Sequence, residues 1–369
     1  MRTSAAEMFD IDFPIFAFSH CRDVVAAVTN AGGFGVLGAA SFSPEQLERE
    51  LSWIEAQVGD RPYGVDVVMP AKQAGKGEID PSELREAFMR MIPREHKDFR
   101  DKVLADQGVP DLDPDDFTLD ATGLSNEASE RLLDVAFAHR MSLLVNALGP
   151  MPRHVAERAR SAGVKTAGLV GSVKHAINQV EVGVDIIVAQ GTEAGGHCGE
   201  ISTMVLTPEV VDAVAPVPVL AAGGIGNGRQ VAAALALGAA GAWTGSIWLT
   251  CAESDITPAL RTALLGAGSG DTVRSRAMTG KPARQLRTAW TEAWDSGEGP
   301  VPLQIPLQTL LYAPVKERAE RHGITPLVGE AVGQIVGSMN TVRSARDMVF
   351  ELVSQTADAG GALARILEG

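Results

Sequence analysis

Short apolar runs recur between residues 13 and 249, and most are followed by a segment with the spacing of an amphipathic helix. The runs are nearly continuous rather than alternating, which is typical of parallel strands covered on both faces. Helix signals follow some of them, such as Ser43 as N-cap and Pro44 as first helical residue. We predict strands over residues 13–18, 34–39, 63–69, 141–148, 164–170, 184–191, 217–224 and 240–249.

Eight strands separated mostly by single helices favour an α/β fold of the TIM (β/α)8 barrel type. An open doubly wound sheet is the alternative, but such sheets have nearer six strands. The predicted barrel covers residues 1–252, and residues 253–369 form a mostly helical C-terminal extension packed on it. A charged, Pro- and Asp-rich segment at about 71–135 interrupts the pattern after the third strand, with a helix at 81–92. It is either a lid or substrate wall, or a solvated helical excursion.

Charge and cysteine content narrow the class of protein. The net charge of −14 argues against binding to nucleic acid or to an anionic membrane surface. The N-terminus lacks the apolar core of a signal peptide, and no stretch is apolar for long enough to span a membrane. Three widely separated cysteines have no metal-ligand spacing, so we predict no metal and a reducing, cytoplasmic location.

Two segments at the ends of the last two strands predict a phosphate site. In a barrel, the loops after strands seven and eight commonly bind phosphate. "AAGGIGNGR" (221–229) contains Gly223 and Gly224, whose backbone N–H groups can face a ligand, and the helix that follows favours an anion at its N-terminus. "TGS" (244–246) adds Gly245 and the hydroxyl of Ser246. Either segment alone is also a common tight turn.

The segment "AQGTEAGGHCGE" (189–200) follows the sixth predicted strand. Gln190 can hydrogen-bond a ring carbonyl or nitrogen, and Gly195 and Gly196 leave room for a planar group. His197 is a base with a near-neutral pKa. An alternative is a glycine-rich loop with an incidental histidine. Together with a phosphate site two strands later, the segment suggests flavin mononucleotide (FMN), with its ring over the barrel mouth.

The chain resembles the nitronate monooxygenase family, formerly called 2-nitropropane dioxygenases. The resemblance rests on four blocks and spans most of the chain: "NAGGFGVLGA" (30–39), "VDIIVAQGTEAGGHCGE" (184–200), "PVLAAGGIGNGRQVAAALALGAAGAWTGS" (218–246) and "TGKPARQLR" (279–287). It implies an FMN-dependent barrel enzyme that oxidises alkyl nitronates or nitroalkanes with O₂ to a carbonyl compound and nitrite, as a possible homodimer.

The resemblance also implies roles for individual residues. His197 acts as general base, or orients an anionic nitronate. Gly223, Gly224, Gly245 and Ser246 hold the FMN phosphate, and Gln190, Gly195 and Gly196 line the flavin. Asp66 falls where the family usually has Asn, which would place a negative charge near the flavin unless the carboxyl is protonated or points away. His20 and Cys21 replace the usual methionine-bearing loop and are candidate pocket residues.

Flavin-dependent enoyl-ACP reductases share the barrel and a comparable "GGH-x-GE" loop. An FMN-dependent reductase that uses NAD(P)H to reduce an enoyl thioester or quinone is therefore the alternative function. A barrel that keeps the flavin for another biosynthetic substrate is a third possibility.

Several other polar residues have competing interpretations. Arg284 and Arg287 either reach the flavin phosphate or tie the tail to the barrel, and we favour the tie. His139 and His175 are predicted on the surface. Cys198 is predicted to be a bystander beside His197, since adjacent side chains usually point apart.

Overall fold

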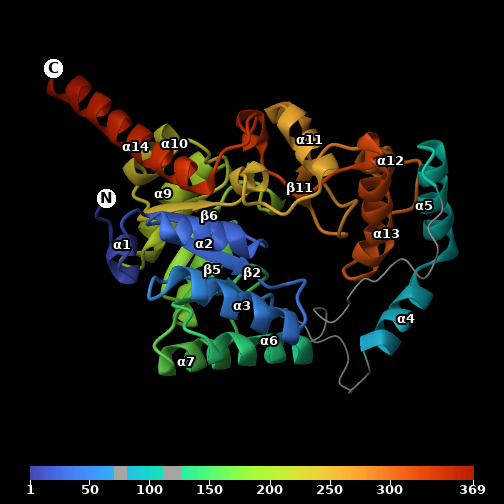
Figure 1. Ribbon diagram of the computed structural model, residues 1–369, viewed down its shortest axis with the longest axis horizontal. Helices are drawn as coiled ribbons and strands as arrows, with labels where there is room; N and C mark the ends of the chain where they lie inside the picture. The colour runs from blue at the N-terminus through green and yellow to red at the C-terminus, as the bar shows by residue number, and fades with distance from the viewer. Residues whose placement is uncertain (70–80, 111–125) are drawn as a thin grey trace.

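The computed structural model describes residues 1–69, 81–110 and 126–369 (Figure 1). Parts of the charged segment predicted at 71–135 therefore lie outside the described residues. Within the described residues, no helix has both the length and the apolar character needed to cross a membrane.

Eight parallel strands close into a barrel in the order β1-β2-β3-β4-β5-β6-β8-β9, which confirms the predicted TIM barrel. All eight predicted strands are present, at β1 (Ile15–Ser19), β2 (Phe34–Gly38), β3 (Gly64–Asp66), β4 (Leu143–Asn146), β5 (Lys165–Val170), β6 (Ile186–Gln190), β8 (Val219–Ala222) and β9 (Gly241–Thr244). The prediction was wrong about the end of the last strand, because residues Ser246–Thr250 form a 3₁₀ helix, η3.

Helices surround this barrel on the outside. They are α2 (Arg22–Asn30), α3 (Pro44–Val58), α6 (Asn126–Ala138), α7 (Arg153–Ser161), α8 (Val173–Glu181), α9 (Thr203–Val214), α10 (Gly228–Ala236) and α14 (Ala345–Glu368). The last of these packs against both α10 and α2, so the end of the tail supplies the helix that follows the eighth strand. A Cβ on Gly228 would lie 2.3 Å from the carbonyl oxygen of Leu352, so glycine allows this close approach of α10 to α14.

The barrel interior is apolar and closed at its N-terminal end by α1 (Ser4–Phe9), a helix that the sequence pattern did not predict. Phe9 packs on Phe16 and Phe34, with ring centroids 5.7 and 4.7 Å away. The opposite end, where the strands have their C-termini, is therefore the end at which a ligand can enter the barrel.

A second helical body contains most of the tail and part of the charged segment (Figure 1). Its helices are α4 (Pro81–Met91), α5 (Arg94–Asp106), α11 (Pro258–Gly266), α12 (Ala289–Asp295) and α13 (Leu307–His322). α4 packs on α13, and α5 packs on α12 and α13. At this contact, Phe99 meets Trp294 edge-on with ring centroids 5.0 Å apart. Thus α4 and α5, which come from the charged segment, pack on helices of the tail. α6, which begins inside 71–135 and ends beyond it, packs on α3 as a barrel helix.

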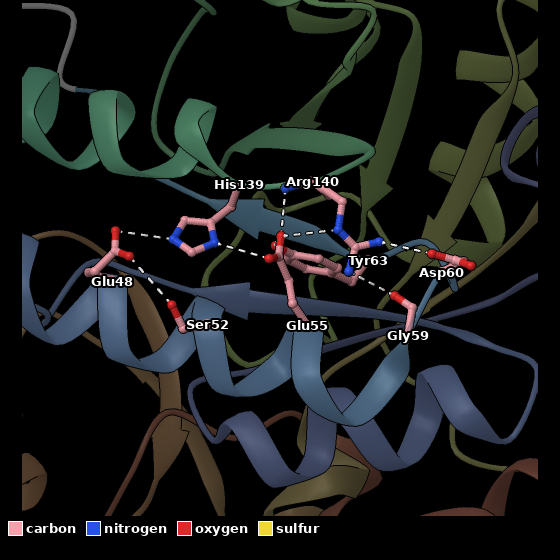
Figure 2. A network of polar contacts seen from close by, with 8 residues as sticks. All are labelled: Glu48, Ser52, Glu55, Gly59, Asp60, Tyr63, His139 and Arg140. Carbon is pink, nitrogen blue, oxygen red and sulfur yellow. Dashed lines mark hydrogen bonds and ion pairs between the residues drawn. The ribbon is translucent and has the colours of Figure 1, made fainter.

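A polar network fixes α3 to the barrel (Figure 2). Glu55 accepts hydrogen bonds from the hydroxyl of Tyr63 (3.0 Å) and the backbone N–H of Arg140 (2.6 Å). The side chain of His139 lies between Glu48 and Glu55, 3.1 and 3.4 Å away, and is only 8% exposed. The prediction of a surface position was therefore wrong for His139, because two carboxylates of α3 compensate its burial; His175 is exposed, as predicted.

We expect Glu55→Ala to lower the free energy of unfolding by about 2 kcal/mol, because it leaves the hydroxyl of the buried Tyr63 without an acceptor. Glu48→Ala is the matched control on the same helix. This substitution removes a half-exposed carboxylate that contacts His139, and it should lower the free energy of unfolding by less than about 1 kcal/mol. Urea unfolding of both variants at pH 7 measures the difference. Equal losses of stability in the two variants would contradict the role of Glu55 as the acceptor for Tyr63.

Candidate active site

The loop that carries His197 is held by the C-terminal tail. β7 (Gly196–His197) leaves the barrel and pairs with β11 (Ala283–Leu286), which in turn pairs with β10 (Thr272–Ser275). In the antiparallel register, His197 is opposite Ala283 and Gly196 is opposite Arg284. A strand added from the tail therefore sets the backbone position of the candidate base. The sequence pattern did not predict this small sheet.

Arg284 strengthens the same connection. Its Nε donates to the carbonyl of Thr192 at 2.7 Å and its Nη1 to the hydroxyl of Thr272 at 3.2 Å, and the side chain is buried. The structure thus favours the tie between tail and barrel over contact with a phosphate. Cys198 also faces the Thr192 carbonyl, with its sulfur 3.6 Å away, and burial raises the pKa of its thiol. Both features make Cys198 a poor nucleophile.

His197 is half-buried, and its Nε2 lies 2.8 Å from the hydroxyl oxygen of Thr279. Burial, and then the positive charge of Lys281, lower the pKa of this imidazole below its ordinary value. The ring is therefore neutral at pH 7 and can accept a proton. Within the described residues, Nδ1 has no hydrogen-bond partner, so it is the nitrogen available to a substrate.

The predicted site glycines divide into two groups by what surrounds them. A Cβ on Gly195 would lie 2.9 Å from the backbone of Val332 and Gly333, and one on Gly223 would lie 2.9 Å from the hydroxyl of Thr203. The space that these two leave is thus filled by the protein itself. The prediction gave Gly195 clearance for a planar ligand, but the structure places the tail backbone in that clearance.

The remaining three glycines face open space. A Cβ on Gly196 would meet nothing within 4 Å, one on Gly224 would meet only Glu193 at 3.4 Å or more, and one on Gly245 only Phe18 at 4.0 Å. Gly196 and Gly224 also have φ of +76° and +69°, which side chains rarely adopt. These are the positions at which a ligand can approach the backbone closely.

Free backbone donors mark the ends of β8 and β9. Within the described chain, the N–H groups of Gly223, Gly224 and Ile225 donate to no acceptor, and the same holds for Gly245. The two loops touch, because a Cβ on Gly226 would lie 3.0 Å from a methyl group of Ile247. Clustered, unpaired N–H groups are the usual means of binding a phosphate.

The N-terminus of α10, in contrast, is already capped. Gln230 Oε1 accepts from the N–H groups of Gly226 (2.8 Å) and Asn227 (3.1 Å), and Gln355 Oε1 accepts from Gly228 (2.9 Å). The capping box and α14 thus take up the N–H groups of Gly226, Asn227 and Gly228 at this helix end, which leaves it fewer donors for an anion than the sequence suggested. The loop before the helix has the free donors instead.

The tail also contacts the phosphate loops. Ser246 Oγ accepts from the N–H of Gly333 at 2.9 Å, and the N–H of Gln334 donates to the Glu193 carbonyl at 2.9 Å. Glu193 in turn lies beside Gly224. Residues 332–335 therefore connect the loops after β6 and β9, and the hydroxyl proton of Ser246 remains available for a ligand oxygen.

Gln190 and Asp66 face the barrel interior at its open end. Alternate residues of a strand share a face, and Val188 belongs to the interior cluster, so Gln190 points inward too. By the same rule Asp66 lies above Gly64, which faces the ring of Phe34 inside the barrel. Gln190 makes no hydrogen bond through its side chain within the described residues, so its amide is free for a ligand.

Asp66 is a buried carboxyl group, 3% exposed, that accepts from the N–H of Ala147 at 3.3 Å. Burial raises its pKa to about 7, against the smaller lowering effect of that hydrogen bond. The group is thus about half ionised at pH 7 and largely neutral below it. Desolvation of the carboxyl therefore reduces the negative charge that an ionised Asp66 would place near an anionic ligand.

His20 and Cys21 have different surroundings. His20 is exposed beyond β1, with Nδ1 2.9 Å from the carbonyl of Gly38 and its ring edge-on to Phe18. Cys21 is 4% exposed and lies in the outer core between strands and helices, with its sulfur 3.2 Å from the carbonyl of Glu253. Cys21 is therefore not a pocket residue, whereas His20 stays a candidate.

These features define a class of protein: a (β/α)8 barrel with a half-buried histidine, His197, and a set of backbone N–H donors without acceptors on loops at the C-terminal end of its strands. The family model for nitronate monooxygenases matches residues 2–355, and the chain belongs to this family. It is an oxidoreductase.

Individual relatives agree with this assignment. The chain is 51% identical to a Mycobacterium tuberculosis protein named as a candidate monooxygenase, over 100% of both chains. It is 29% identical to a Staphylococcus aureus protein named as a candidate nitronate monooxygenase, over 95% of this chain and 96% of that protein. The structure is similar to that of nitroalkane oxidase from Streptomyces ansochromogenes, with a TM-score of 0.79, 27% identity, and coverage of 97% of this chain and 99% of that one.

Proposed function

We propose that this protein is an FMN-dependent enzyme that oxidises alkyl nitronates and nitroalkanes with O₂ to carbonyl compounds and nitrite. The observation that carries the proposal is the position of His197, a neutral imidazole on the loop that packs against the free N–H groups after β8. The two loops are neighbours, because a Cβ on Gly223 would lie 3.1 Å from the backbone nitrogen of Ala194. The candidate base and the candidate anion site thus lie on neighbouring loops.

The residues present fit FMN. Gly223, Gly224, Ile225 and Gly245 offer unpaired N–H groups, and Ser246 offers a hydroxyl, for a phosphate. Gln190 offers a free amide inside the barrel mouth for a ring carbonyl or nitrogen. Gly196 leaves its face of the β7 loop open. When bound, FMN supplies the redox chemistry with the nitronate and O₂.

The chain's own residues handle the proton. A neutral nitroalkane loses its α-proton to His197, and the resulting imidazolium then stabilises the negative charge of the nitronate. A nitronate that arrives as the anion needs no base and is only oriented by the same ring. In the overall reaction, two nitronates and one O₂ give two carbonyl compounds and two nitrites. Atoms and charge balance without a further reductant.

Anaerobic stopped-flow reduction of the FMN-loaded protein tests this function against the alternative. We expect a nitronate to bleach the flavin absorbance, and NADH or NADPH to leave it unchanged on the same timescale. Bleaching by NAD(P)H but not by nitronate would overturn the proposal in favour of a reductase of an enoyl thioester or quinone. A protein with no affinity for FMN would contradict both functions.

Gly245→Ala tests the phosphate site separately. The residue has φ of −128° and open space at its Cβ position, so alanine should fold without strain, while its methyl group would project toward the predicted phosphate. We expect FMN to bind about tenfold more weakly, equivalent to about 1.4 kcal/mol. Gly266→Ala, at another open position far along the tail in α11, is the control and should bind FMN normally. Unchanged affinity in Gly245→Ala would place the phosphate elsewhere.

A further inference from the structure

We propose that Thr279 is a positioning residue that holds His197 as the tautomer with a proton on Nε2, which leaves Nδ1 as the nitrogen that receives the substrate proton. This inference rests on the proposed role of His197 as a base. It adds a residue from the tail, 82 positions away in sequence, to the proton-transfer site.

The hydrogen-bonding capacity of the threonine hydroxyl assigns the tautomer. A hydroxyl has one proton to donate and two lone pairs with which to accept. Thr279 Oγ1 donates to the carbonyl of Lys281 (3.2 Å) and accepts from the N–H of Lys281 (3.3 Å). With the hydroxyl proton on the Lys281 carbonyl, the remaining lone pair faces Nε2 of His197 at 2.8 Å, and in the proposed tautomer the imidazole is the donor in this contact.

The turn around Thr279 fixes the hydroxyl in place. Both of its backbone partners belong to the turn Thr279–Lys281, in which Gly280 has φ of +82°. The N–H of Gly280 is bonded to the carbonyl of Arg276, and Arg276 Nε donates to the carbonyl of Gly280. A Cβ on Gly280 would lie 1.8 Å from the carbonyl oxygen of Leu303, so a side chain at this position would collide with the backbone. The hydroxyl is therefore held before a substrate arrives.

The charged groups around the ring are consistent with this tautomer. Lys281 is the charged side chain whose field reaches His197, and it disfavours the imidazolium. Arg284, on the paired strand, directs its guanidinium to Thr192 and Thr272 instead. No carboxylate among the described residues bonds His197, so the neutral hydroxyl of Thr279 is the acceptor that orients the ring.

Long-range ¹H–¹⁵N NMR of the FMN-loaded protein with ¹⁵N-histidine tests the tautomer directly. The His197 signals are identified by their absence in His197→Asn. We expect a protonated-type Nε2 and an unprotonated-type Nδ1 at pH 8, with Thr279→Ser unchanged and Thr279→Val showing exchange between tautomers. A wild-type Nδ1–H tautomer would overturn the proposal, because the hydroxyl would then be donating to the ring.

Kinetics with a neutral nitroalkane give an independent readout. Thr279→Val should lower kcat/KM about tenfold, with a smaller loss for the preformed nitronate, which needs no base. The hydroxyl stabilises the imidazolium more than the neutral ring, so its removal should also move the acid limb of the kcat/KM profile to lower pH. Mere loosening of the loop would hydrate the ring and move that limb to higher pH, which would contradict a positioning role.

Two further variants keep the proposal testable if Thr279→Val folds poorly. Thr279→Ser retains the hydroxyl and should have the wild-type kcat/KM, with the acid limb of its pH profile at the wild-type pH. Thr262→Val, on α11, removes a hydroxyl that bonds only within its own helix and should change neither. If the tautomer is as expected but His197→Asn turns over nitroalkanes normally, His197 is not the base and Nδ1 does not receive the substrate proton, which overturns this proposal while the proposed function stands. If the wild-type protein has the expected tautomer but oxidises neither nitroethane nor ethyl nitronate, the proposed function fails while the positioning of the ring by Thr279 stands.

Discussion

His197→Asn is expected to lose turnover of neutral nitroalkanes by about 10²- to 10⁴-fold, the usual contribution of a general base. Asparagine keeps a polar side chain on β7 but cannot accept a proton at neutral pH. FMN affinity should stay within about twofold, because the free N–H groups after β8 and β9 are unaltered. Steady-state nitrite release with nitroethane, together with FMN titration, measures both quantities.

The substrate pair sharpens the test of His197. Ethyl nitronate, supplied as the anion, bypasses proton abstraction and should lose much less activity in His197→Asn than nitroethane. His175→Asn, an exposed histidine on α8, is the matched control and should behave as wild type. Normal nitroethane turnover in His197→Asn would overturn the role of His197 as base. Equal losses with both substrates would point to a role in binding instead.

Asp66→Asn is expected to stabilise the protein at high pH. Burial raises the pKa of the folded carboxyl from 3.8 to about 7, so between these values the folded state binds a proton that the unfolded state has lost. Stability therefore falls as pH rises through this window. Asparagine has no such loss. At about 1.4 kcal/mol for each pKa unit, it should add on the order of 4 kcal/mol above pH 7 and almost nothing near pH 4.

Urea unfolding at pH 5 and pH 8 measures this difference for Asp66→Asn. Asp98→Asn, at an exposed position on α5, is the control and should show no comparable change in its effect between the two pH values. A stabilisation of Asp66→Asn that is the same at both pH values would show that the carboxyl is not protonated in the folded protein. The KM for a nitronate should also rise above pH 7 in wild type but not in Asp66→Asn, since only the wild type then has a second negative charge at the barrel mouth.

Local patterns were sufficient for most of the barrel. Each predicted strand corresponds to an observed one, because a run such as "VDIIV" is buried wherever it lies in a covered sheet. The errors occurred where a local pattern continued past a tertiary boundary. Residues 246–250 are as apolar as a strand, yet they turn into η3, where Trp248 donates to the Thr244 carbonyl. The capped N-terminus of α10 could not be predicted either, because Gln355 comes from the last helix.

The sequence by itself determined the barrel, the family, and the segments that meet at its open end. Each strand is recognisable from its own run of apolar residues, and strands that follow one another along the chain lie side by side in the barrel. In a parallel barrel the loops after β6, β8 and β9 must therefore lie at the same end. Only the tertiary structure decided what these segments contact. The tail fills the space at Gly195 and places Thr279 against His197. Its last helix, α14, completes the ring of helices around the barrel. Burial gives Asp66 its raised pKa. These properties depend on desolvation and on contacts between distant residues, which exist only once the chain has folded.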